Sequence, residues 1–171
     1  WNTAGHRMQL AVNLSARSLT DASFPGRIQG LLEKYGMDAA ALEFELTESA
    51  LMEDPERAQE VLKRLSALGI HLSIDDYGTG YSTLSNLTQL PVQTLKIDLS
   101  FVQRMRESVR HAAVVASTVQ MAHVLGLQVV AEGVEDEETL KALLTLKCDQ
   151  AQGYLFAKPL PAHELDPRRW A

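Results

Sequence analysis

Short apolar runs alternate along this chain with longer segments in which apolar residues recur at helical spacing. The apolar runs predict strands at 8–14, 42–46, 70–74, 92–97, 127–131 and 149–156, where the last range includes the exit from its strand. The helical spacing predicts helices at 27–35, 55–68, 82–87, 109–125 and 137–146. Such alternation predicts an α/β fold in which right-handed crossovers connect parallel strands.

Polar side chains stand at or just beyond the C-terminal ends of the predicted strands. They are Asn13, Glu45, Asp75, Asp76, Lys96, Asp98, Glu132 and Gln152. In a TIM-type (β/α)8 barrel these strand ends converge on one mouth, where catalytic residues lie. The pattern therefore predicts one polar site that draws on all six βα units.

Six strands do not close such a barrel, and 171 residues is below its usual size of about 200 or more. One interpretation is a barrel whose first two strands precede this chain, and the other is an open parallel sheet. We favour the incomplete barrel, because an open sheet usually binds its ligand at one switch point rather than at every strand end. The start at Trp1, without Met or a signal peptide, also suggests a piece of a longer protein.

Several of these residues also have ordinary structural explanations. Glu45 could lie on a solvated strand face, and Glu132 could be a loop acid. Asp75 and Asp76 precede Tyr-Gly-Thr-Gly, which is typical of a turn. Taken together, however, these acids would crowd one mouth and repel each other, which a bound divalent cation, or two, would relieve.

Lys96 lies inside an apolar strand, where a buried ammonium needs a partner charge. Asp98 is either that partner or the cap of the next turn. The ligand candidates are all oxygen donors, which favours Mg²⁺ or Mn²⁺ over zinc. Such a centre suits an anionic phosphate ester. The remaining candidates lack metal-ligand spacing, and we predict structural roles for His71, His111, His123 and Cys148.

Composition narrows the class of protein. Hydrophobic residues make up 46% and charged residues 22% of the chain, as in a globular protein rather than a disordered one. The net charge of −6 argues against binding to nucleic-acid polymers through a basic surface. One cysteine cannot form an internal disulfide, and no apolar run reaches the roughly 20 residues that span a bilayer. We therefore expect a cytoplasmic domain, although the parent protein could be anchored to a membrane.

Seven short motifs carry a family resemblance. In order they are VNLS (12–15), ELTE (45–48), DDYGTGYS (75–82), LKID (95–98), AEGVE (131–135), QGY (152–154) and KPL (158–160). With these motifs the chain resembles the EAL domain of bacterial cyclic-di-GMP phosphodiesterases, from about residue 8 to residue 161. The resemblance implies a modified TIM barrel with one antiparallel strand, and hydrolysis of cyclic di-GMP to linear pGpG by water that a divalent metal activates.

The resemblance also implies ligand roles. Asn13, Glu45 and Asp75 would hold one Mg²⁺ or Mn²⁺ ion, and Asp75 and Asp76 would hold a second, so that Asp75 bridges the two. Glu132 would be a further ligand or would hold the attacking water.

Other matched positions would serve catalysis, the substrate and the loop. Lys96 would orient water and offset charge, Gln152 would lie near the water on the metal, and Glu48 would anchor the loop 77–82. The implied substrate contacts are Asp98, Gly78, Thr79, Tyr81 and Pro159. The loop after Asp76 and the helix after Asp98 would mediate a homodimer.

One departure concerns the Glu-Ala-Leu motif that gives the family its name. It is absent, and we expect it to lie before Trp1, so that residues 1–171 form a partial EAL domain lacking roughly the first two strands. A sensory or GGDEF domain is expected upstream in the parent protein. The Glu of the Glu-Ala-Leu motif is a metal ligand in the family, so the resemblance leaves the activity of residues 1–171 alone open. The intact downstream motifs favour an enzyme for the parent protein. The alternative is a catalytically impaired domain that acts as a cyclic-di-GMP receptor or a protein-interaction module.

Overall fold

A parallel sheet of six strands organises this computed structural model, which describes residues 8–79, 87–161 and 163–164. The strands are β1 (Leu10–Leu14), β2 (Leu42–Thr47), β3 (His71–Tyr77), β4 (Thr94–Ile97), β5 (Gln128–Ala131) and β6 (Gln150–Ala151). They lie side by side in chain order, and each neighbouring pair is parallel. This order is that of a barrel wall, because a doubly wound sheet reverses its order at a switch point.

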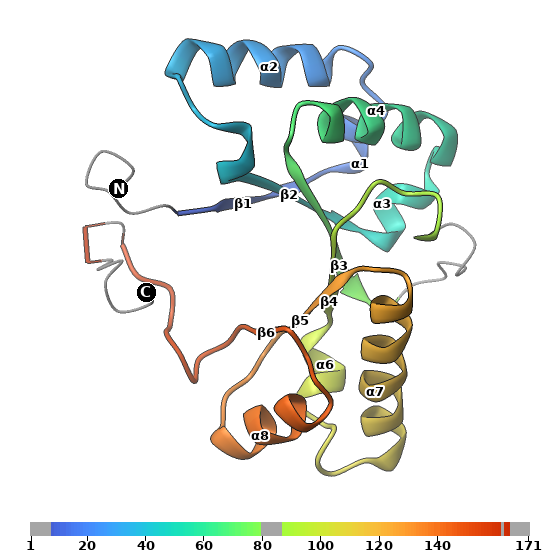
Figure 1. Ribbon diagram of the computed structural model, residues 1–171, viewed down its shortest axis with the longest axis vertical. Coiled ribbons are helices and arrows are strands. Elements are labelled where there is room, and N and C mark those ends of the chain that lie inside the picture. Colours follow the sequence, from blue (N-terminus) through green and yellow to red (C-terminus); the bar gives the residue numbers. More distant parts are fainter. Residues whose placement is uncertain (1–7, 80–86, 162, 165–171) are drawn as a thin grey trace.

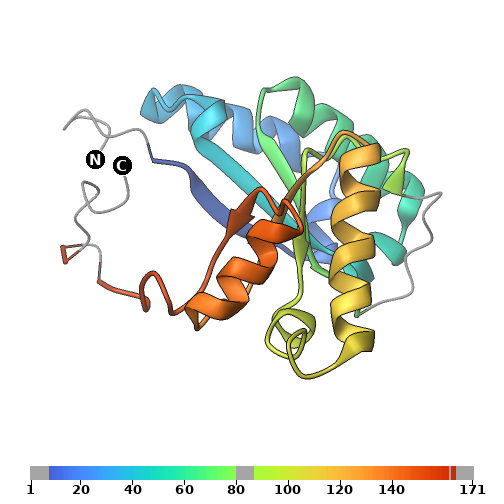
Figure 2. The ribbon, with the colours of Figure 1, turned by 60° about the horizontal axis from the view of Figure 1, so that its bottom comes forward.

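The helices lie along the outer side of the curved sheet (Figure 1). They are α1 (Ala16–Leu19), α2 (Phe24–Tyr35), α3 (Glu48–Met52), α4 (Pro55–Ala67), α6 (Leu99–Val102), α7 (Val109–Val124) and α8 (Glu137–Thr145), with a 3-10 turn η2 (Ala39–Ala41). A second view shows the same arrangement, with α7 and α8 beside the strands β4 to β6 (Figure 2). The partial barrel predicted from the sequence is confirmed, and all pairings among the described strands are parallel.

Some boundaries differ from the predicted ones. Helix α2 begins at Phe24 rather than at residue 27, because Pro25 fits the first helical turn. The last strand ends after Ala151, since the chain then turns away and the Leu155 N–H donates to the carbonyl of Val134. The short helices α1, α3 and α6, of four or five residues each, were not predicted from the pattern of apolar residues. Most of the predicted helix 82–87 lies outside the described residues.

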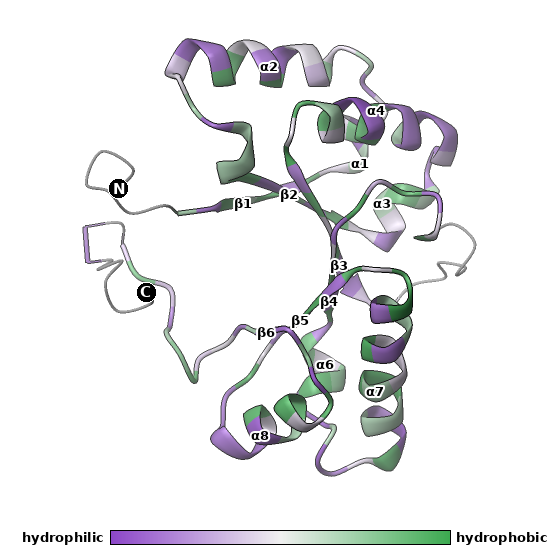
Figure 3. Cartoon of the chain, in the orientation of Figure 1, coloured by the Kyte–Doolittle hydropathy of each residue, from purple (hydrophilic) through white to green (hydrophobic). Residues whose placement is uncertain are grey.

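The core lies between the sheet and the outer helices. Leu46, Leu72 and Leu95 point to this side from three adjacent strands and are fully buried. Leu62 of α4 and Val115 of α7 are buried against the sheet from the helical layer. Helix α4 is hydrophilic on its outward side (Figure 3). In the described part of the chain, no helix combines the length and the hydropathy needed to cross a membrane.

The opposite face of the sheet is polar, because side chains alternate along each strand. In β2 the apolar residues are buried while Glu43, Glu45 and Thr47 lie on the other face. The strand register places Asn13 beside Glu45, and Glu45 beside Ser73. The inner face of this partial barrel is therefore where the polar residues of neighbouring strands meet.

Candidate active site

Lys96 stands at the centre of a cluster of carboxylates on the inner face. Its Nζ lies 2.6 Å from Glu45 Oε1, 2.6 Å from Glu132 Oε1 and 3.2 Å from Asp75 Oδ1. The lysine side chain is 6% exposed, and the three carboxylate side chains are 12–15% exposed. The sequence-based prediction that the strand ends meet at one mouth is confirmed for these four residues.

Each member of the cluster comes from a different strand. Glu45 belongs to β2, Asp75 to β3 and Lys96 to β4, while Glu132 directly follows β5. The Glu132 N–H donates to the carbonyl of Ile97, which holds it level with the end of β4. Because the strands are parallel and in order, their C-terminal ends are at one level, and one side chain from each of them reaches the same point.

Burial and crowding set the charges of the cluster. Burial alone would lower the pKa of Lys96, but its hydrogen bonds with Glu132 and Glu45 raise that pKa well above the ordinary value. The ammonium is therefore retained at neutral pH. Burial raises the pKa of Glu132; the bond from Lys96 opposes this shift, and the charges of Asp75 and Glu45 add to it.

Asp76 and Asp98 form the outer part of the site. Asp76 adopts a left-handed backbone conformation with φ of +54°. Burial raises its pKa, and the charges of Asp75 and Asp98 raise it further. Asp98 caps α6, where its carboxylate accepts from the Ser100 N–H at 2.9 Å. Of the two roles predicted for Asp98, that of a cap is confirmed, and the partners of Lys96 are the three acids above.

Three of these acids are arranged as cation ligands. Among the described residues, Asp75, Asp76 and Glu132 each offer an oxygen within 4.8 Å of the others. The buried Asp75 Oδ1 accepts no hydrogen bond from the residues that the structure describes, although it lies within ion-pair distance of Lys96. A set of carboxylate oxygens with an unused buried acceptor fits a hard divalent cation such as Mg²⁺ or Mn²⁺.

Three other predicted site residues, Asn13, Gln152 and Pro159, are exposed. Asn13 is beside Glu45 in the register but exposed. The Gln152 side chain is exposed, and its backbone pairs with Ala131 and Val134. Pro159 is exposed and lines a shallow surface pocket together with Gln152.

The loop after Asp76 is described as far as Thr79. Gly78 has φ of +103°, and a Cβ there would meet the Phe101 ring at 3.0 Å. The Thr79 hydroxyl donates to the carbonyl of Asp76 at 2.9 Å. Tyr81, a predicted substrate contact, lies outside the described residues.

Glu48 lies beside the start of this loop. It is the first residue of α3 and is 4% exposed. Burial raises the pKa of Tyr77, and the Glu48 charge raises it further, so the two side chains are near each other. This position is compatible with the predicted anchoring of the loop 77–82, of which the structure describes residues 77–79.

Sequence reasoning missed the polar residues deeper on the inner face. The Ser73 hydroxyl is fully buried and has no hydrogen-bond partner among the described residues. His71 Nε2 lies 2.8 Å from Thr94 Oγ1, and this hydrogen bond between neighbouring strands agrees with the structural role predicted for His71. The signal for this layer was the period-two spacing of His71, Ser73 and Asp75 along one strand.

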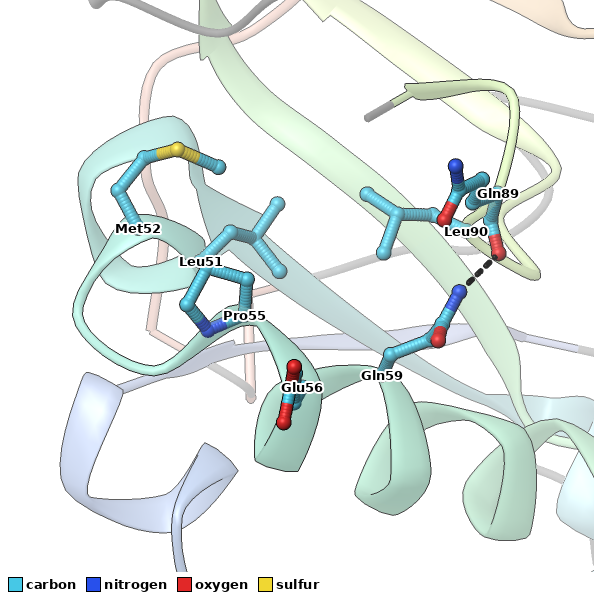
Figure 4. Close-up of a pocket in the computed structure, with 7 residues that line it drawn as sticks. All are labelled: Leu51, Met52, Pro55, Glu56, Gln59, Gln89 and Leu90. Carbon is cyan, nitrogen blue, oxygen red and sulfur yellow. Dashed lines mark hydrogen bonds between the residues drawn. The ribbon is translucent and has the colours of Figure 1, made fainter. Parts of the chain in front are cut away.

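A separate small pocket of about 110 Å³ opens between α3, α4 and the segment before β4 (Figure 4). Leu51 and Leu90 face each other across it, and the Gln59 side chain donates to the Gln89 carbonyl at 3.0 Å. None of the predicted site residues lines it. The carboxylate cluster, rather than this pocket, carries the chemistry of the described residues.

Comparison with known proteins assigns the family. Residues 1–159 match the family profile described as EAL domain. This chain belongs to the EAL domain family. The carboxylate cluster is thus the strand-end site of an EAL domain, and the family named on sequence motifs is confirmed.

Relatives of this EAL domain include named phosphodiesterases. Cyclic di-GMP phosphodiesterase NbdA of Pseudomonas aeruginosa is 44% identical over 164 residues, which are 95% of this chain and 21% of NbdA. Cyclic di-GMP phosphodiesterase RocR of the same species is 39% identical over 95% of this chain and 42% of RocR. The chain therefore spans about a fifth to two fifths of the length of these relatives.

Solved structures resemble this EAL domain closely. The MucR phosphodiesterase of Pseudomonas aeruginosa, in complex with c-di-GMP, superposes with a TM-score of 0.91 at 38% identity, over 96% of this chain and 67% of that one. BlrP1 of Klebsiella pneumoniae, in a complex with manganese and cyclic di-GMP, gives a TM-score of 0.84 at 34% identity, over 92% of this chain and 41% of that one.

Proposed function

We propose that this EAL domain contributes the active centre of a phosphodiesterase that hydrolyses cyclic di-GMP to linear pGpG. The carrying observation is the cluster itself, in which Glu45, Asp75 and Glu132 converge on Lys96 from neighbouring strands. The EAL relatives that are named cyclic di-GMP phosphodiesterases support the choice of substrate. Hydrolysis of this messenger would lower its level and switch the behaviour that it controls.

Five residues are proposed to hold Mg²⁺ or Mn²⁺, namely Asn13, Glu45, Asp75, Asp76 and Glu132. The close approach of the Asp75, Asp76 and Glu132 oxygens supports three of them. When bound, two such cations would offset the phosphodiester charge and lower the pKa of water. The solved complex of BlrP1 with manganese supports the choice of metal.

The remaining polar residues are proposed to serve the reaction around these ligands. Lys96 remains charged beside Glu132, so it can orient water and donate to a developing anion. Gln152 would hold water from the next strand. Substrate contacts are proposed for Asp98, Gly78, Thr79, Tyr81 and Pro159.

The setting of the domain is also a proposal. Residues 1–171 would be a partial EAL domain in a cytoplasmic part of a longer protein, with a sensory or GGDEF domain upstream. The small share of each relative that the chain covers supports this. We further propose a homodimer through the loop after Asp76 and the helix after Asp98.

A turnover assay tests the proposed activity. The protein is incubated with cyclic di-GMP and Mg²⁺ or Mn²⁺, with a chelator as control, and the products are separated by chromatography. We expect conversion to pGpG that the chelator abolishes. Calorimetric titration of cyclic di-GMP in Ca²⁺ measures binding separately from turnover. If the domain is a receptor, we expect cyclic di-GMP to bind but no pGpG to form with Mg²⁺ or Mn²⁺.

A further inference from the structure

The contacts of Lys96 use the same oxygens that a cation would need. Its ammonium has three N–H donors, and carboxylates from three strands surround it. Asp75 and Glu132 are partners of Lys96, and they also belong to the group whose oxygens lie within 4.8 Å of one another. The lysine and a divalent cation thus draw on one set of acceptors.

Lys96 is the one positive charge that offsets the acids of this site among the described residues. In formal charges, Glu45, Asp75, Asp76 and Glu132 count −4 and Lys96 counts +1, which leaves −3 in a mostly buried site. Without the lysine the site would hold −4. Buried carboxylates that lose their counter-ion destabilise a fold strongly, because each is left with an uncompensated charge away from water.

We propose that Lys96 is the resident counter-ion of this site, which holds the strand-end carboxylates together until divalent cations take over part of that role. The inference rests on the proposed metal-dependent function and extends it to the cation-free protein. The lysine binds Glu45 of β2, Asp75 of β3 and Glu132 after β5, so it ties three strands to its own strand β4. Its loss makes the stability of the fold depend on the cation.

Thermal unfolding of a Lys96→Met variant tests this at neutral pH, with a chelator and with saturating Mg²⁺ or Mn²⁺. In chelator we expect the variant to unfold roughly 10 °C below the wild type, from the loss of a buried partner in a chain of this size. Added cation raises the midpoint of the variant by more than that of the wild type. This larger shift is the expected signature, because a residue that only packs against the sheet would not produce it.

Lys141→Met is the matched control. Lys141 is exposed on α8 and lies 3.8 Å from Glu137, so its loss removes a lysine charge away from the cluster. We expect its unfolding midpoint and its cation shift to equal those of the wild type.

A double variant keeps the inference testable if Lys96→Met does not fold in chelator. Lys96→Met combined with Glu45→Gln removes one negative charge along with the positive one. We expect the double variant to fold without cation and to unfold above the single variant. A double variant no more stable than the single one would overturn the inference.

The possible results separate the inference from the proposed function. If the cation shifts the wild type and shifts Lys96→Met by no more, Lys96 is not the resident counter-ion, although the metal site stands. If the cation shifts neither protein, both the metal site and the inference fail.

Discussion

At the scale of single residues, two buried side-chain oxygens on the inner face have no hydrogen bond from the described residues, and only one of them belongs to the carboxylate cluster. Asp75 Oδ1 lacks a hydrogen bond within the carboxylate cluster, where a cation would use it. Ser73 Oγ also lacks a hydrogen bond, but it lies one layer deeper, beside Thr94 in the register. A buried hydroxyl without a partner costs free energy that an apolar side chain does not.

Ser73→Ala should therefore stabilise the cation-free protein by about 1 kcal/mol, because it deletes an unsatisfied hydroxyl from a fully buried position. Unfolding in urea measures the change. Thr94→Val is the matched control: its hydroxyl has His71 as partner, so the same measurement should show a loss of stability. A stability loss in Ser73→Ala would mean that this hydroxyl has a partner in solution.

At the scale of elements, one carboxylate joins three segments at the N-terminal side of the sheet. Asp149 Oδ2 lies 2.8 Å from His123 Nε2 in the last turn of α7, and it accepts from the Val129 N–H of β5 at 2.8 Å. Burial alone would raise the pKa of Asp149, but the bonds from His123 and Val129 lower it below its ordinary value. A carboxyl group whose pKa is lower in the folded than in the unfolded protein stabilises the fold at pH values above its unfolded pKa. This stabilisation is lost as the pH falls through the pKa of the folded state.

Asp149→Asn should therefore reduce stability by about 0.5–1 kcal/mol near pH 7, a size typical of partly exposed pairs. The difference from the wild type should be smaller near pH 3, because the unfolded chain, whose aspartate pKa is about 3.9, is then largely protonated while the folded carboxylate begins to gain its proton. Urea unfolding at the two pH values measures it. Asp54→Asn is the control, since asparagine caps helix α4 as well as aspartate does. An equal loss at both pH values would contradict the charge-based explanation.

The elements also show what the sequence could predict. The convergence of Glu45, Asp75, Lys96 and Glu132 was predictable because parallel strands in chain order bring their C-terminal ends to one level. The short helices after these strands were missed, because four or five residues contain too little of a helical period to recognise.

The two roles of Asp98, as partner of Lys96 or as cap, could not be separated without knowing where β4 ends. Strand β4 ends at Ile97, which leaves Asp98 free to cap α6. Gln152 directly follows β6, as predicted, but β6 is an edge of the sheet within the described residues, so Gln152 is exposed.

At the scale of the whole molecule, the sheet is a barrel wall with two edges. Within the described residues, β1 and β6 each have one neighbouring strand, and Leu10 and Val12 of β1 are exposed. The site nevertheless assembles, because its central members come from β2 to β5, away from both edges. The carboxylate cluster of this EAL domain therefore belongs to the middle of the sheet.

Turnover of cyclic di-GMP by wild type, Asp75→Asn and Asp54→Asn tests the central claim most directly. Asp75→Asn keeps the shape of the side chain but removes the charge of the acid that contacts Lys96 and faces Asp76 and Glu132. We expect pGpG formation in Mn²⁺ to fall by at least about a hundredfold in Asp75→Asn and to stay unchanged in Asp54→Asn, a loss of about 2.7 kcal/mol or more in transition-state stabilisation. Wild-type turnover by Asp75→Asn would contradict the claim that this carboxylate cluster is the active centre.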